Sequence, residues 1–568
     1  MRKIIILLFI PLTTLSSCSE KETSFQKKEL IGVWSGLLFQ TESKYDSIIL
    51  KPANQPKEAI LFKNGIQTVY PLTSKKETLE FKGDSGFRFD GVLSKNKQNL
   101  NAVLTNDLWA RSLNFKKKQN QWISRIEKPE IIDTDYKVYL EFYFDSLETL
   151  QAKIQSNKEN RKSHFTIEEV WIDGNDINFK ITNNRFGLSA TYDARNKKLS
   201  INYKNTNSKR KIQLTKLPEH ELEGYLPRTI HKKYEYKIPK SFDTLIETGS
   251  LEEVGIDVSL LGFMDEMNTG KFNHVHSVII TKDSKLVFEE YFHGYHREYL
   301  HDIRSAFKSF SSLAVGKAMM QNNALKVDNT LTSYYPEYKI EDTQKNSITI
   351  HQALTMSTGL ALEDEDKMQW DNSDWVGYKL SLPMKYRPGE TFEYSSGGSN
   401  LLTGVIQQST DQYLPLFIYE DILIPMRIDK FQMLTSPQWR GYLAGSFYLR
   451  PIDFTKFGLL ILNKGKWNDE QLISESWIEQ ATTPHIKSSY PANTDYGYLW
   501  RLLERNINGA TVKTIEAWGN GGQFLIIIPE LDMTISFTSG NYNLFPEMER
   551  PFEILNNYIL PAVKLKNN

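Results

Sequence analysis

The chain contains a single cysteine, Cys18, among its 568 residues. One thiol has no disulfide partner within the chain, so the fold must rely on its core for stability. Charge of either sign is not in excess either, because 69 Lys and Arg residues balance 69 Asp and Glu residues. A formal net charge of +0 provides no electrostatic support for nucleic-acid binding, and we expect no nucleic-acid partner.

Long apolar runs are missing except at the N-terminus. The basic start Met1-Arg2-Lys3 is followed by an apolar stretch from Ile4 to Leu15. About a dozen apolar residues are too few to span a bilayer stably, but they match the hydrophobic region of a signal peptide. The sequence therefore predicts a cleaved export signal over residues 1–18.

The apolar stretch ends in Leu15-Ser16-Ser17-Cys18, which resembles a bacterial lipobox. Acylation explains a lone cysteine at this position better than structure does. We therefore predict lipidation of Cys18, a polar tether over residues 19–29, and a location in the bacterial cell envelope, either periplasm or cell surface. The lipid would hold the protein at the membrane. The alternative is an ordinary secretory signal with an incidental cysteine.

Residues 30–217 consist of short alternating runs, aromatic residues and Asn, Asp or Gly turns, which are typical of β-structure. A weak repeat with a spacing of 99 residues relates the segment from Phe87 to that from Phe186. We expect two β-rich modules, over 30–128 and 129–219, with one helix near 146–154. A charged, proline-containing linker follows over residues 220–250.

Three tryptophans in these modules, Trp34, Trp109 and Trp122, allow two interpretations. In the first, they line a groove for an envelope glycan or a protein partner. Aromatic residues at alternating spacing are more often part of a core, and we favour the core.

The stretch Ser305-Ala306-Phe307-Lys308 places a hydroxyl and an amine one helical turn apart. Serine is a weak nucleophile until a neighbouring base takes its proton, and a neutral lysine amine can be that base. A helix N-terminus would add free N–H groups where an oxyanion forms. The alternative is that Ser305 caps a buried helix and Lys308 is a surface lysine.

The same Ser-x-x-Lys pattern also begins at Ser24, Ser94 and Ser208, in lysine-rich polar stretches. Only Ser305 leads into an apolar pattern at helical spacing, which predicts an amphipathic helix behind it. The context of Ser305 therefore favours a catalytic role for this copy alone.

Two later segments carry further motifs. Pro388-Gly389-Glu390-Thr391-Phe392-Glu393-Tyr394-Ser395-Ser396-Gly397 precedes an apolar run, and Trp518-Gly519-Asn520-Gly521-Gly522-Gln523 precedes the predicted buried strand Phe524–Pro529. The next stretch, Leu531 to Thr538, alternates apolar and polar residues and predicts a half-exposed strand.

Together these motifs resemble the serine β-lactamase and penicillin-binding-protein superfamily. The resemblance is closest to the β-lactamase-related serine hydrolases, which include class C β-lactamases, D-peptidases and family VIII-type esterases. It covers about residues 251–562 and implies an α+β fold, with an antiparallel sheet flanked by helices, a helical subdomain, and the site between them. Further matches occur in the expected order, at residues 250–257, 276–287, 354–360 and 496–500.

The resemblance implies a role for each matching residue. Ser305 would be the acylated nucleophile, Lys308 its base, and Tyr394 a proton shuttle to the leaving group. The backbone N–H groups of Ser305 and Gln523 would form the oxyanion hole. Four further residues would line the substrate-binding edge: Ser396, Asn520, Gly521 and Gly522.

Two positions depart from the family pattern. Asn520 stands where β-lactamases carry the Lys of Lys-Thr-Gly, and Ser396 stands where they carry the Asn of Tyr-x-Asn. Loss of a fixed positive charge argues against efficient β-lactam hydrolysis and favours an ester, an amide or a neutral-ended peptide. The simpler interpretation of Asn520 is a turn residue in a glycine-rich hairpin.

The sequence thus predicts a serine hydrolase that cleaves an ester, amide or D-amino-acid peptide bond in the cell envelope. The alternative is a non-catalytic or slowly acylating binding or sensor protein with the same fold. No cofactor is expected. His274, His276, His293 and His296 have metal-compatible spacing, but no carboxylate or cysteine set accompanies them, and we expect no metal site.

Overall fold

The computed structural model describes residues 25–565, except for short gaps. Cys18, the predicted signal peptide and residues 19–24 of the predicted tether lie outside the described residues. The described part forms two compact units. None of its helices is both long and apolar enough to cross a membrane. The gaps are residues 40–46, 64, 76, 84–86, 107, 127–135, 157–160, 163–165, 183–186, 205–208, 223–224, 228–233 and 243–245.

The first unit is a β-sheet structure with its own apolar core, in which Trp34 is 1% exposed. The predicted helix near 146–154 is wrong, because this stretch begins with a turn and continues as a strand. The Asp145 carboxylate accepts hydrogen bonds from the backbone N–H groups of Leu147 and Thr149, which fixes the turn. The sheet runs in the order β13 (Leu150–Ser156), β12 (Tyr136–Phe144), β1 (Gly32–Phe39), β19 (Lys209–Lys216), β18 (Lys198–Lys204), β17 (Gly187–Asp193), β16 (Asp176–Ile181) and β15 (Ile167–Asp173).

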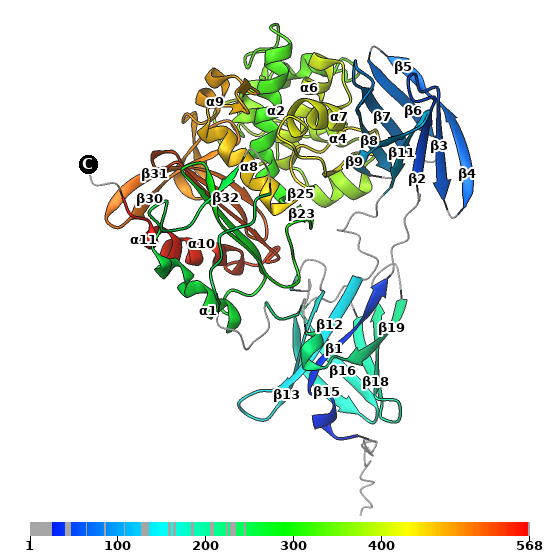
Figure 1. The fold of residues 1–568 in the computed structure, drawn as a ribbon, viewed down its shortest axis with the longest axis vertical. Helices are drawn as coiled ribbons and strands as arrows, with labels where there is room; N and C mark the ends of the chain where they lie inside the picture. Colours follow the sequence, from blue (N-terminus) through cyan, green and yellow to red (C-terminus); the bar gives the residue numbers. More distant parts are fainter. Residues whose placement is uncertain are drawn as a thin grey trace, which may run out of the picture. The chain divides into compact units, whose positions relative to one another are not determined.

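The second unit contains the other β-rich segment and the whole C-terminal domain (Figure 1). Strands of two sheets contribute side chains to one core in this segment, and this core includes Trp122, which is 2% exposed. The prediction that Trp34 and Trp122 are core residues is therefore confirmed. The strands of the segment are β2 (Ser47–Lys51), β3 (Glu58–Lys63), β4 (Ile66–Pro71), β5 (Thr73–Lys75), β6 (Thr78–Gly83), β7 (Phe87–Leu93), β8 (Leu100–Asn106), β9 (Trp109–Asn114), β10 (Lys116–Lys118) and β11 (Gln121–Arg125).

The repeated segments form matching antiparallel meanders, β7-β8-β9 in one unit and β17-β18-β19 in the other. Their outer edges are completed differently. In the first unit, β19 pairs with β1, so the strand at the start of the predicted first module belongs to the sheet formed by the predicted second module. In the second unit, β9 pairs instead with β24 (Gln432–Leu434) of the C-terminal domain. The units therefore do not follow the predicted boundary between residues 128 and 129.

The C-terminal domain is α+β, as predicted, and its main sheet is buried on both faces. In β32, Phe524 and Ile526 face one core, whereas Leu525 and Ile527 face another. Side chains of a strand point alternately to opposite faces, so this division shows that helices cover both sides. The sheet order is β20 (Glu247–Thr248), β22 (Lys285–Tyr291), β21 (Val275–Lys282), β33 (Met533–Ser539), β32 (Gln523–Ile528), β31 (Ala510–Gly519), β30 (Arg501–Ile507), β29 (Ala492–Tyr496) and β28 (Ile486–Ser489).

Helices form the remaining layers of this domain (Figure 1). The helices α1, α10 and α11 contribute to the core on one face, and α2 and α8 to the core on the other. The α-helices are α1 (Gly262–Asn268), α2 (Phe307–Gln321), α3 (Ile350–Leu354), α4 (Trp375–Ser381), α5 (Ser396–Asn400), α6 (Leu402–Thr410), α7 (Leu414–Ile418), α8 (Pro451–Leu462), α9 (Glu475–Ala481), α10 (Arg550–Ile554) and α11 (Leu560–Ala562).

The prediction of a buried strand at Phe524 is confirmed by β32, but the prediction of a half-exposed strand after it is wrong. Every residue of β33 is buried. Its polar face is covered, and the hydroxyls there pair with other hydroxyls. Thr534 bonds to Thr281, and Thr538 to Ser277, each at 2.6 Å between oxygens. Paired hydroxyls avoid the cost of burying unsatisfied polar groups.

Helix α2 differs from the predicted amphipathic helix, because all its residues from Phe307 to Gly316 are buried. Two of the serines among its apolar residues, Ser309 and Ser311, satisfy their hydroxyls with backbone carbonyls. Ser309 Oγ donates to the Leu499 carbonyl at 2.6 Å, and Ser311 Oγ donates to the Leu443 carbonyl at 2.7 Å. The helix that carries the Ser-x-x-Lys motif is therefore a central, well-packed element of the domain.

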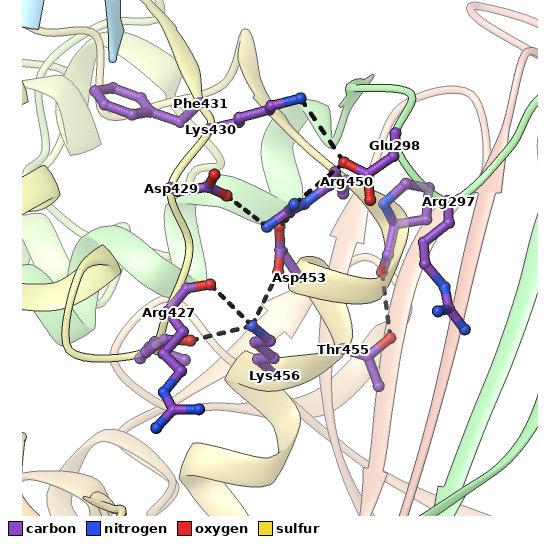
Figure 2. A network of polar contacts seen from close by, with 12 residues as sticks. Arg297, Glu298, Arg427, Asp429, Lys430, Phe431, Arg450, Asp453, Thr455 and Lys456 are labelled. Atoms are coloured by element: carbon purple, nitrogen blue, oxygen red, sulfur yellow. Dashed lines mark hydrogen bonds and ion pairs between the residues drawn. The ribbon is translucent and has the colours of Figure 1, made fainter. Parts of the chain in front are cut away.

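The start of α8 holds a buried ionic network (Figure 2). Asp453, whose side chain is 0% exposed, pairs with Arg450 and with Lys456, the latter at 3.1 Å between Nζ and Oδ1. Arg450 extends the network to Asp429 at 2.9 Å and to Glu298 at 3.3 Å. Since each buried charge has an opposite partner, the network fixes the loop before α8 to the helix.

The C-terminal part of the predicted linker packs onto this domain. The Phe242 ring lies 5.0 Å from the Arg450 guanidinium carbon and 5.2 Å from Lys456 Nζ. The Tyr236 hydroxyl donates to the Val287 carbonyl at 2.9 Å, and the short strand β20 pairs in parallel with β22. These contacts make residues 234–248, where described, part of the domain surface.

Candidate active site

The Ser-x-x-Lys motif has the geometry that its spacing predicts. Ser305 lies in a 3₁₀ turn, Arg304–Ala306, directly before α2, and Lys308 lies in the first turn of that helix. Lys308 Nζ donates to Ser305 Oγ at 2.9 Å and to the Ala444 carbonyl at 2.6 Å. The Lys308 side chain is buried, so Lys308 is not a surface lysine.

The turn before the nucleophile has a strained backbone that the sequence did not reveal. Arg304 has a φ of +49°, in the left-handed region that non-glycine residues rarely adopt. The Asp302 carboxylate accepts a hydrogen bond from the Arg304 backbone N–H at 2.8 Å and pairs with its Nε at 3.0 Å. Across the turn, a Cβ on Gly519 would lie 2.4 Å from the Ile303 carbonyl, so only glycine permits this approach of β31.

Tyr394 joins this pair, as the sequence predicted. Lys308 Nζ lies 4.9 Å from the centre of the Tyr394 ring, and the hydroxyl interacts with Ser305 and Lys308. Burial opposes ionisation of this hydroxyl. The positive charges of Lys308 and Arg501 and the hydrogen bonds outweigh burial, so the pKa of Tyr394 is lowered. A phenol with a lowered pKa ionises more readily, and its phenolate can accept and return a proton.

Arg501 is a component of the site that sequence reasoning missed. It begins β30, is 8% exposed, and its guanidinium carbon lies 5.6 Å from the Tyr394 ring and 4.8 Å from the Trp518 ring. The guanidinium also donates to the Tyr490 carbonyl. Because the guanidinium is buried and hydrogen-bonded, solvent screens its positive charge little, and this charge favours ionisation of Tyr394. Arg501 directly follows the predicted motif that ends at Trp500, which is the only local signal for it.

Substitution Arg501→Met is expected to lower the acylation rate at neutral pH by about tenfold. Without the positive charge the pKa of Tyr394 rises, so the phenolate forms only at higher pH. The acidic limb of the pH–rate profile should therefore move to higher pH, and activity should recover partly in alkaline buffer. Arg501→Lys keeps the charge and is the matched control. An unshifted profile in Arg501→Met would show that the arginine does not act on Tyr394.

The glycine-rich turn between β31 and β32 lies against the same 3₁₀ turn. Gly521 and Gly522 have φ values of +92° and +95°, which explains glycine at both positions. Asn520 Nδ2 donates to Asn543 Oδ1, and Asn520 Oδ1 accepts from the Asn543 backbone N–H at 2.9 Å. Asn520 therefore acts as a turn residue in this structure. Gln523, the predicted second oxyanion donor, starts β32 and is fully buried.

Ser396 follows Tyr394 at the start of α5 and is 9% exposed. The segment is held by Glu363, which accepts from Ser395 Oγ at 2.8 Å and from the Gly397 backbone N–H at 2.7 Å. Glu363 itself pairs with the buried Lys379 at 2.7 Å. Burial would raise the pKa of Glu363, but Lys379 and these hydrogen bonds outweigh it and lower the pKa. The acid is thus a charged anchor for the Tyr394 segment.

The histidines with metal-compatible spacing lie elsewhere in the domain. His276 Nδ1 and His301 Nε2 are 2.8 Å apart and share a hydrogen bond, and the His276 ring stacks on Tyr295 at 4.1 Å. Burial lowers the pKa of His293 to about 3, so it is neutral. Among the described residues, no cluster of three or more His, Cys, Asp or Glu side chains has an arrangement able to hold a metal ion.

Comparison with known proteins gives a consistent result. Residues 274–555 match the family model described as Beta-lactamase. Protein flp of Staphylococcus aureus (strain NCTC 8325 / PS 47) is 28% identical over 134 residues, or 22% of this chain. The matching region spans only 27% of that protein's length.

Two solved structures show the extent of the structural likeness. A penicillin-binding protein homologue from Caulobacter crescentus has a TM-score of 0.45 at 14% identity, and covers 54% of this chain and 99% of its own. A penicillin-binding protein from Bacillus halodurans has a TM-score of 0.41 at 15% identity, and covers 52% of this chain and 99% of its own.

The C-terminal domain is thus of the β-lactamase class, preceded by a β-rich region of many strands. Residues 274–555 place this domain in the family of β-lactamase-related serine hydrolases. Members of this family are typically hydrolases that work through an acyl-enzyme.

Proposed function

We propose that this protein is a serine hydrolase of the cell envelope that cleaves an ester, amide or D-amino-acid peptide bond through an acyl-enzyme on Ser305. The observation that carries the proposal is the 2.9 Å contact between Lys308 Nζ and Ser305 Oγ, with the Tyr394 hydroxyl beside both. Nucleophile and base within hydrogen-bond reach, with the base oriented by a third group, is the arrangement that activates serine.

In the proposed reaction, the Ser305 Oγ–H proton passes to the pair formed by Lys308 and Tyr394 as Oγ attacks the carbonyl carbon. The tetrahedral oxyanion is stabilised by the backbone N–H groups of Ser305 and Gln523. The pair then returns the proton to the leaving alcohol or amine as the C–O or C–N bond breaks. Water repeats the sequence on the acyl-enzyme and releases a carboxylic acid.

The residues of the predicted substrate-binding edge favour neutral substrates. Asn520 carries no charge and is engaged with Asn543, and the nearby Arg501 is 8% exposed and enclosed by aromatic rings. A carboxylate on the substrate would therefore find no exposed cation at either position. We propose that uncharged esters and amides are better substrates than β-lactams, which carry a carboxylate.

This proposal is tested by rapid kinetics with a neutral p-nitrophenyl ester, alongside a chromogenic β-lactam and a D-alanyl-D-alanine peptide. The expected result is a burst of p-nitrophenol, steady turnover, and slower reaction of both carboxylate-bearing substrates. Slow acylation without turnover would favour a slowly acylating sensor instead. No acylation by any of the three would contradict the proposal.

We also propose that Cys18 carries a lipid that holds the protein at the membrane of the envelope. The support is the lipobox-like Leu15-Ser16-Ser17-Cys18 after a basic start and an apolar run. A partner of the N-terminal β-rich region, either a glycan or an envelope protein, stays a prediction.

A further inference from the structure

We infer that the turn between β8 and β9 is a positioning element of the catalytic centre, through Leu108 and Trp109. This turn belongs to the β-rich segment formed by β2 to β11, which is called the N-terminal region here. The inference rests on the proposed function and adds to it a part of the chain that lies outside residues 274–555, the segment matched by the family model. The β8–β9 turn supports the backbone segment Tyr442–Ala444, and this segment orients Lys308.

The first step is the continuity of the sheet. Strand β9 pairs with β24, with Trp109 opposite Leu434, and the Thr435 N–H donates to the Leu108 carbonyl at 2.7 Å. β24 pairs with β25 (Phe447–Leu449), and β25 pairs with β23 (His301–Asp302). The nucleophile follows β23 by three residues, so an unbroken set of hydrogen-bonded strands joins the N-terminal region to Ser305.

The second step is side-chain packing behind the site. Leu108 and Trp109 pack against a small buried cluster that contains Tyr442 and Ala444. The Trp109 ring also meets the Tyr448 ring edge-on, with 5.6 Å between centres. The other buried members of this cluster are Met368, Trp375 and Leu434.

Third, the segment Tyr442–Ala444 holds the side chain of Lys308 in place. The Ala444 carbonyl accepts a hydrogen bond from Lys308 Nζ at 2.6 Å, and the Tyr442 hydroxyl donates to Glu365 at 2.7 Å. On its other side, the segment is fixed by the Leu443 N–H, which donates to Asn400 Oδ1 at 3.0 Å. The Ala444 carbonyl thus holds the catalytic Lys308. The segment that carries this carbonyl is fixed by Asn400 of α5 on one side and packs in a cluster with the β8–β9 turn on the other.

The fourth step is the attachment of the N-terminal region itself. Thr105 Oγ1 and the Tyr413 hydroxyl are 2.6 Å apart in the buried interface, and the Arg88 guanidinium carbon lies 4.0 Å from the Tyr413 ring. Arg88 is paired in turn with Asp90, which is 1% exposed. A buried, hydrogen-bonded contact of this kind fixes the position of the N-terminal region, and therefore of its β8–β9 turn, against the C-terminal domain.

The consequence follows from packing. Truncating Trp109 leaves a void beside the buried cluster that contains Tyr442 and Ala444, and we expect these residues to shift toward it. A displacement of about 1 Å in a group that positions catalytic atoms can cost on the order of 10²-fold in rate. Trp109 is therefore a positioning residue, because it acts through Ala444 and Lys308.

The test compares Trp109→Ala and Trp109→Phe with Trp122→Phe in the full chain. Trp122 is a matched control, because it is buried in the core of the same region and its Nε1–H donates to the Ala53 carbonyl at 2.9 Å, away from the cluster at the site. We expect Trp109→Ala to lower the rate at which a fluorophosphonate phosphonylates Ser305, with loss of fluoride, by about 10–100-fold per folded molecule and to change the pH profile of that rate. Trp109→Phe should restore most of the rate, and Trp122→Phe should leave rate and profile unchanged.

A second readout separates this inference from the proposed function. In protein labelled with ¹³C at lysine Cε, the Lys308 resonance is assigned by its loss in Lys308→Ala. It should shift in Trp109→Ala and not in Trp122→Phe, whether or not the serine is acylated. Absence of acylation in the wild type would contradict the proposed function alone. An unmoved Lys308 resonance in folded Trp109→Ala, or equal effects of Trp109→Ala and Trp122→Phe, would overturn the inference.

Discussion

Replacing Ser305 with alanine is expected to reduce ester turnover by about 10⁴-fold or more, because no other nucleophile replaces the lost Oγ. Ser305 is half-buried and its hydroxyl contacts only polar groups of the site, Lys308 and Tyr394, so the melting temperature should stay close to that of the wild type. Steady-state kinetics and differential scanning calorimetry on the same preparation measure the two quantities.

Ser94 provides the matched control for this substitution, since it begins another Ser-x-x-Lys pattern. Its Oγ bonds to Asn96 in an exposed turn, far along the chain from α2. Ser94→Ala should keep full activity. Turnover of Ser305→Ala within a factor of ten of the wild type would remove Ser305 as the nucleophile.

Replacing Lys308 with alanine is expected to lower the acylation rate by about 10²–10⁴-fold, the usual range for loss of a positioned acid or base. The change also removes a charge that lowers the pKa of Tyr394, so a smaller fraction of this remaining base is ionised at neutral pH. Stopped-flow measurement of the p-nitrophenol burst reports this rate directly.

Lys317 on the same helix is the control for the lysine substitution, because it is only partly buried and lies nine residues further along α2. Lys317→Ala should acylate at the wild-type rate. If Lys308→Ala also acylates at that rate while remaining folded, another group is the base and the proposed roles of Lys308 and Tyr394 must be reassigned.

The parts of the site that lie in short motifs could be predicted from the sequence. Ser305 and Lys308 come together because residues three apart share a helix face, and the positive φ values of Gly521 and Gly522 match the turn expected there. The class of the C-terminal domain followed from the order of several such motifs. Local backbone geometry determines both the Ser305–Lys308 contact and the glycine-rich turn.

The misses have non-local causes. Strand β33 shows an alternating pattern, but its polar face is covered, and hydroxyls such as Thr538 are satisfied by other strands. Arg501 reaches Tyr394 across the fold, which no spacing along the chain encodes. The pairing of β9 with β24 joins segments more than 300 residues apart, so the sequence repeat alone suggested two separate modules.

The most direct test of the central claim is intact-mass spectrometry of the protein after reaction with a fluorophosphonate probe, with peptide mapping of the product. An activated serine at Ser305 predicts one adduct per molecule, located on the peptide that contains Ser305, and no adduct on Ser305→Ala. Failure of the folded wild-type protein to react, or an equal adduct on Ser305→Ala, would contradict the account.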